Sequence, residues 1–116
     1  MGDEGVVIQL GGPRRLRLTV DAAARFEEEL GVSFDQAFNL GKGETFESWV
    51  SRVLYPFLID EEPGLTLEAV RKIVDKHLAP LPMFSKIRRC QEIRKAVLKA
   101  GKAFEDSLES GKFMED

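Results

Sequence analysis

Hydrophobic and polar residues alternate at the start of the chain, on either side of a Gly-Gly-Pro turn at residues 11–13. The apolar positions are Val6, Ile8 and Leu10 before the turn and Leu16, Leu18 and Val20 after it. This period of two, interrupted by turn-forming residues, predicts a β-hairpin with one apolar face. An isolated hairpin is marginally stable in water, so other elements must cover that face. The rest of the chain shows only helical patterns.

Four segments with helical periodicity follow, each preceded by a residue that favours a helix N-cap. The predicted helices cover 22–30, 34–40, 46–58 and 67–78, with Asp21, Ser33, Thr45 and Thr66 as their N-caps. The third has the clearest apolar face. Pro56 lies inside it and should kink the helix or tighten its last turn, because proline lacks the backbone N–H.

A fifth, longer helix is predicted from Met83 to about Leu108, with apolar residues near heptad spacing. Together these elements predict an α+β fold in which an N-terminal hairpin packs on a bundle of four to five helices and a long basic helix follows. We divide the chain into residues 1–82, the hairpin plus helical domain, and residues 83–116, the C-terminal amphipathic basic helix and an acidic tail.

Composition agrees with a single small core. The chain has 116 residues, of which 43% are hydrophobic, and it contains a single cysteine, Cys90. It cannot form an internal disulfide, and no apolar run approaches the length that spans a bilayer. We therefore expect a cytoplasmic protein (host cytoplasm, if the protein is viral) with no membrane contact.

The formal net charge of −3 hides an uneven distribution. Residues 86–102 carry seven basic side chains and one acidic one, whereas the segments before and after them are both acidic. Seven cations on one helix could neutralise phosphates or meet an acidic protein surface. The alternative is a solvated helix face that balances an acidic domain.

Side chains for catalysis or metal binding are not grouped in the sequence. His77 is the single histidine and is expected to be solvated or to cap its helix, and Cys90 is expected to be a small buried hydrophobic residue. Asp60, Glu61 and Glu62 are expected to form a solvated turn, and Gly41-Lys42-Gly43 lacks the spacing of a phosphate loop. We expect no enzyme activity, no cofactor, no metal and no small-molecule substrate.

Three short motifs resemble the tail assembly chaperones of tailed bacteriophages and gene transfer agents. They are the run Leu16-Arg17-Leu18, the helix DAAARFEEEL at 21–30 followed by Gly31-Val32-Ser33-Phe34, and the capped segment TLEAVRKIV at 66–74. The likeness covers about residues 6–78, and the region from Met83 onward departs from the pattern. The resemblance implies a non-enzymatic protein that binds the tape-measure protein, and tail tube subunits in some cases, before the tail polymerises.

Our first hypothesis is therefore a phage or prophage tail assembly chaperone whose C-terminal helix engages a helical client. The alternatives are a small nucleic-acid-binding regulator that uses the same basic helix, which is not favoured, and a structural tail component; self-association is left open. The residues predicted to bind the partner are Lys86, Ile87, Arg88, Arg89, Arg94, Lys95, Val97, Lys99, Lys102 and Phe104.

Overall fold

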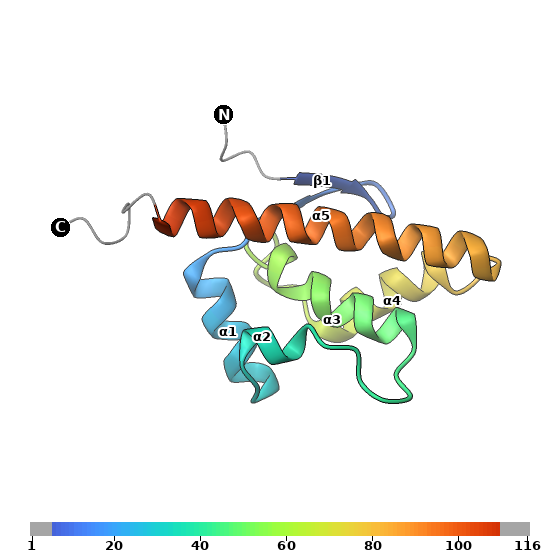
Figure 1. Cartoon of the computed structure of the whole chain (residues 1–116), viewed down its shortest axis with the longest axis horizontal. Helices are drawn as coiled ribbons and strands as arrows, with labels where there is room; N and C mark the ends of the chain where they lie inside the picture. Colours follow the sequence, from blue (N-terminus) through green and yellow to red (C-terminus); the bar gives the residue numbers. More distant parts are fainter. Residues whose placement is uncertain (1–5, 110–116) are drawn as a thin grey trace.

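The computed structural model describes residues 6–109 and confirms the α+β class (Figure 1). The acidic tail, as far as it extends beyond residue 109, lies outside the described residues. A two-stranded antiparallel sheet precedes a set of helices. The elements are β1 (Val6–Gln9), β2 (Pro13–Leu16), α1 (Val20–Leu30), α2 (Phe34–Ala37), α3 (Phe46–Leu58), α4 (Leu67–Leu78) and α5 (Met83–Glu109).

The hairpin forms as predicted, but its second strand begins and ends earlier than the alternation suggests. Pro13 already pairs with Gln9, and Leu10, Gly11 and Gly12 make the connection. The two glycines have φ of 70° and 113°, in the region that favours glycine. The predicted strand residue Val20 instead opens α1 and is 49% exposed.

Threonine and serine side chains begin the helices, as the sequence predicts at three of four positions. The hydroxyl oxygens of Ser33, Thr45 and Thr66 each accept a hydrogen bond from the backbone N–H three residues later. The exception is α1, which is capped by Thr19 and not by Asp21; Asp21 lies in the first turn. The helix predicted over 34–40 is shorter than expected, and α3 continues to Leu58 past Pro56.

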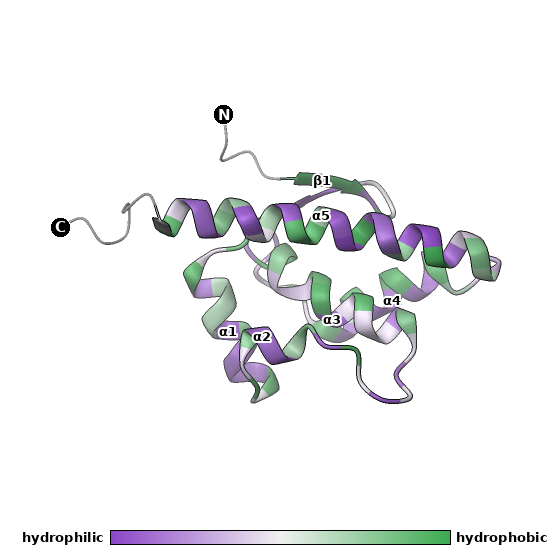
Figure 2. Cartoon of the chain, in the orientation of Figure 1, coloured by the Kyte–Doolittle hydropathy of each residue, from purple (hydrophilic) through white to green (hydrophobic). Residues whose placement is uncertain are grey.

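Helix α3 is the centre of the molecule. Every residue from Val53 to Leu58 is buried, and α3 packs against α1, α4, α5 and β2. Figure 2 shows that α3 is largely hydrophobic, whereas hydrophilic and hydrophobic residues alternate along α5. A helix that is apolar on most of its sides is expected at the centre of a core, and the second half of α3 has this character.

Helix α5 shares this core. It lies between the hairpin and α3 in Figure 1, and it contacts β1, β2 and α3. Its buried residues, which belong to the same apolar cluster as those of α3 and the hairpin, are Cys90, Ile93, Val97 and Ala100. The helix therefore covers the apolar face of the hairpin, which residues 1–82 alone would leave open on that side.

The acidic turn after α3 pairs with the arginines of the hairpin region. Three ion pairs join Arg14 to Glu62, Arg15 to Glu61 and Arg17 to Asp60, at 3.1, 3.6 and 3.9 Å. The backbone N–H of Arg17 also donates to the carbonyl of Phe57. The turn is exposed, as expected from the sequence, but its charges are matched by specific partners.

Candidate functional site

The predicted cations on α5 fall into two groups. Three are paired: Lys86 with Glu47, Arg89 with Glu92 and Lys102 with Asp106. The other four are exposed, and none forms an ion pair within residues 6–109; they are Arg88, Arg94, Lys95 and Lys99. Unpaired charge on this helix is thus concentrated in its middle.

The three apolar residues predicted to engage a partner lie in different environments. Val97 is 2% exposed and belongs to the core, and Phe104 is partly buried against that core. The side chain of Val97 is therefore taken up by the core, and Phe104 leaves only part of its ring exposed. Ile87 differs because it lines an open pocket.

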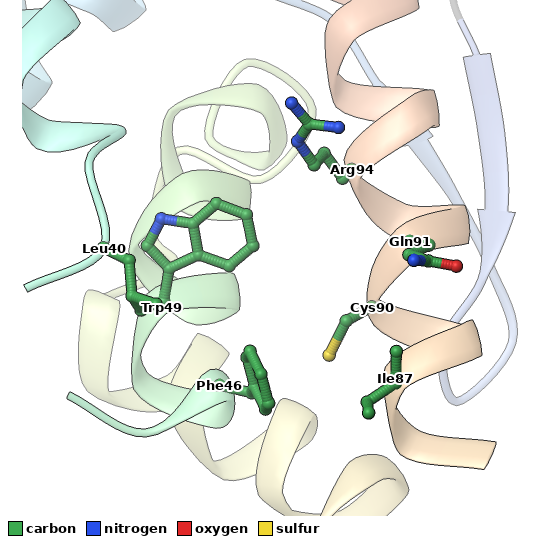
Figure 3. A pocket seen from close by; sticks show the side chains of 7 residues that line it. All are labelled: Leu40, Phe46, Trp49, Ile87, Cys90, Gln91 and Arg94. Carbon is green, nitrogen blue, oxygen red and sulfur yellow. The ribbon is translucent and has the colours of Figure 1, made fainter. Parts of the chain in front are cut away.

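This pocket lies between α3 and α5 and has a volume of about 330 Å³ (Figure 3). Its walls come from both helices and from the loop before α3: Leu40, Phe46, Trp49, Ile87, Cys90, Gln91 and Arg94. Leu40 is 51% exposed and Phe46 is 36% exposed, so the pocket is open to solvent. We call it the α3–α5 pocket.

Two side chains of α3 hold the loop that forms one wall of the pocket. Trp49 Nε1 donates to the carbonyl of Phe38 at 2.8 Å. Arg52 donates from Nε to the carbonyl of Ala37 at 2.6 Å and from Nη2 to that of Asn39 at 2.7 Å. Three successive carbonyls are therefore fixed to α3, and Leu40 follows them directly at the rim.

Arg52 also forms an ion pair with Glu44, which closes the same loop. Burial by itself would raise the pKa of Glu44. Hydrogen bonds from Arg52, from the backbone N–H of Gly41 and from Ser48 outweigh burial and hold the pKa of this carboxyl below its ordinary value. The loop from residue 37 to residue 44 is thus tied at several points to the first half of α3.

Near the start of α5, Glu47 and Lys86 join the two helices that form the pocket. The hydrogen bond and charge of Lys86 lower the pKa of Glu47 despite its burial. Cys90, one turn further on, is 6% exposed, which confirms the prediction of a buried cysteine. Burial, and then the nearby Glu47 charge, raise the pKa of its thiol, so the neutral form is favoured at neutral pH.

The lining of the pocket provides mostly apolar contacts and contains no carboxylate or histidine that could act as a general acid or base. His77 lies away from it, against Gly11 of the hairpin connection. Within residues 6–109, no group of three or more His, Cys, Asp or Glu side chains could hold a metal ion. In the same part of the chain, no helix is both long and apolar enough to cross a membrane. The arrangement can bind an apolar group and place it beside the cation of Arg94.

Sequence reasoning missed the pocket because its aromatic walls occupy core positions in the periodicity of α3. Phe46 and Trp49 start the apolar face that continues through Val50 and Val53, so this periodicity predicts that both pack in the core. Only the tertiary structure shows that α5 and the start of α3 enclose an open pocket at these positions. Phe84, in the first turn of α5, is 86% exposed.

Comparisons of the chain with protein-family models, with curated proteins and with solved structures found no match in any of the three. Functional inference therefore rests on the residues and geometry of the chain itself.

Proposed function

We propose that this protein is a non-enzymatic assembly chaperone that binds a helical client in the cytoplasm, and that it acts in the assembly of phage or gene-transfer-agent tails. The observation that carries the proposal is the open α3–α5 pocket, whose lining is mostly apolar and whose α5 side bears Arg94, a cation with no ion-pair partner among residues 6–109. A chaperone of this kind needs a surface that takes up apolar side chains of a client and releases them again.

The proposed role in tail assembly rests on the resemblance to tail assembly chaperones. Its motifs fall on the hairpin, on α1 and on the start of α4, which all pack around α3. The matched region thus includes the helix that provides Phe46 and Trp49. Helix α5 lies outside it and adds Ile87 and Arg94 to the same pocket.

The composition of the pocket supports binding and not catalysis. It contains one thiol, whose pKa is raised, and no histidine or carboxylate among its lining residues. Nucleophilic catalysis needs a base within reach of the nucleophile. The tape-measure protein is the proposed client because the resemblance implies it, and because a long helical protein exposes apolar faces before it is packed in the tail.

Co-expression with the tape-measure protein encoded in the same genome tests this function. We expect the client to become soluble and to co-purify with the wild-type chain. Phe46→Glu places a charge at the pocket rim and should reduce co-purification, whereas Val20→Glu changes an exposed valine on α1 and should not. If the wild-type chain leaves the client insoluble and unbound, the chaperone proposal is wrong.

A second candidate function follows from the outer side of α5. Arg88, Lys95, Lys99 and Lys102 recur at a spacing that places them on one face of the helix, away from Val97. This stripe could neutralise nucleic-acid phosphates. Binding to duplex DNA with an affinity that falls steeply with salt, and that Lys95→Glu lowers, would favour this function; no binding at low salt would exclude it.

A structural tail component is a third candidate. It makes a distinct prediction, because such a component is retained in the finished particle whereas an assembly chaperone is not. Mass spectrometry of purified particles separates the two.

A further inference from the structure

The α3–α5 pocket continues beyond its lining residues along one side of α5. Met83, Ile87, Cys90 and Arg94 are spaced by four, three and four residues, so they lie along one face of the helix. Met83 is 60% exposed and extends the apolar surface one turn past Ile87. From Met83 to Arg94 this face is about 16 Å long, since each residue of a helix rises about 1.5 Å.

The face is apolar at one end and cationic at the other. Met83 and Ile87 lie at the apolar end, and Phe46 of α3 joins them across the pocket. Arg94 marks the other end, next to Gln91, and Figure 3 shows its side chain on the pocket side of α5. Arg94 is exposed and forms no ion pair with any residue from 6 to 109.

We propose that this face docks an amphipathic α-helix of the client, with bulky apolar side chains in the pocket and an acidic side chain paired with Arg94. The proposal rests on the proposed function for the nature of the client. It specifies the recognition: apolar anchors spaced by three or four residues, and a carboxylate about three turns from the first anchor. A length of about 16 Å corresponds to three turns of such a helix.

The positions of the cations on α5 favour an amphipathic client helix over a nucleic acid as the occupant of this face. The cations of the outer stripe, Lys95 and Lys99, lie on a different side of α5 from Arg94 and do not line the pocket. A nucleic acid would meet that stripe and would gain nothing from Phe46 or Ile87. A partner that needs both an apolar anchor and an anion, close together, fits the end of the pocket at Arg94.

The chain carries its own reporter for the test. Trp49 is its single tryptophan and lines the pocket. Burial of its ring by a ligand shifts the fluorescence emission to shorter wavelength. The probe is a synthetic amphipathic peptide of about 20 residues with Leu at i, i+4, i+7 and i+11 and Glu beside the last anchor. A second peptide, used as the control, has Lys in place of that Glu.

Two variants with the same change of charge on the same helix give the control. Arg94→Glu alters the pocket, and Lys99→Glu alters the outer stripe. We expect the acidic peptide to shift the Trp49 emission of the wild type and to bind Arg94→Glu at least about tenfold more weakly, while its affinity for Lys99→Glu changes less than about threefold. The lysine peptide should show the reverse preference and bind Arg94→Glu better than the wild type.

Three results would overturn the docking mode. They are a Trp49 emission that saturating acidic peptide leaves unchanged, equal weakening by the two substitutions, and a wild-type dimer in sedimentation equilibrium that Arg94→Glu dissociates. The last result would assign the face to a second copy of this chain. The peptide titration and the co-expression experiment fail independently: a client held equally well by wild type and Arg94→Glu keeps the chaperone function and removes this mode.

Discussion

Glu47 of α3 and Lys86 of α5 form an ion pair in which Oε2 and Nζ are 2.8 Å apart, and their side chains are only 15% and 18% exposed. Both residues lie in the first turn of their helix. A carboxylate is favoured there by the helix dipole and a cation is not, so Glu47 compensates for the position of Lys86. The pair joins the two helices whose side chains form the pocket.

This pair should contribute to stability at neutral pH and less in acid. The pKa of Glu47 is lowered in the folded protein, so its contribution is complete above its ordinary pKa of 4.5 and is lost as the pH falls through the folded value. Glu47→Gln should lower the free energy of unfolding by about 1 kcal/mol at pH 7. Urea unfolding at pH 7 and pH 3 measures the difference between the two proteins, which should shrink in acid.

Glu28→Gln is the matched control for this substitution. Glu28 is exposed in the last turn of α1, so its replacement should change stability by less than about 0.5 kcal/mol. A difference between wild type and Glu47→Gln that stays constant down to pH 3 would contradict the assignment to an ion pair.

Arg52 should be the most important polar side chain for the wall of the pocket. Arg52→Ala removes the donors to the carbonyls of Ala37 and Asn39 and leaves Glu44 without its cation. We expect a loss of about 2 kcal/mol in unfolding free energy, and faster amide exchange around residues 37–44. Arg71→Ala, on the exposed side of α4, should change stability by less than about 0.5 kcal/mol.

Helix positions could be predicted from the sequence because their signals are local. Ser33, Thr45 and Thr66 specify N-caps through a hydroxyl that reaches a backbone N–H three residues away. The alternation of Val6, Ile8 and Leu10 specified the hairpin in the same way. The cap of α1 was misplaced because Thr19 and Asp21 both favour capping, and the chain path after β2 decides between them.

The candidate site depended on contacts between distant residues, which no local pattern contains. Phe46 and Val53 have the same place in the helical period, yet one is at a rim and the other is 3% exposed. Likewise, the charge of Arg94 predicts a role in partner binding, but the sequence does not show that Arg94 lines the pocket whereas Lys99 does not. The pocket forms where α5 passes α3, so it exists only in the tertiary arrangement of the two helices.

Cys90 should react slowly with thiol reagents. The residue is 6% exposed, and burial raises the pKa of its thiol, which lowers the fraction of the reactive thiolate. We expect its rate with Ellman's reagent at pH 8 to be about two orders of magnitude below that of the urea-unfolded chain. Ile87→Ala widens the pocket beside it and should accelerate the reaction. A folded protein that reacts at the unfolded rate would show that the pocket does not enclose the thiol.

A side chain at Gly11 should be destabilising, for two separate reasons. Its φ is 70°, which strains any residue with a Cβ, and an added Cβ would lie 2.8 Å from Nε2 of His77. Gly31 isolates the first reason, because its φ is 72° and an added Cβ there meets nothing within 4 Å. Gly31→Ala should therefore cost about 1 kcal/mol, and Gly11→Ala about 1 kcal/mol more, as measured by urea unfolding.

His77→Ala in the Gly11→Ala background should recover the additional loss, because it removes the obstructing ring and leaves only the backbone strain. Equal costs for the two alanine substitutions would mean that His77 does not pack against the hairpin connection. An additional cost that His77→Ala removes would establish that the imidazole of His77 on α4 packs against the hairpin connection.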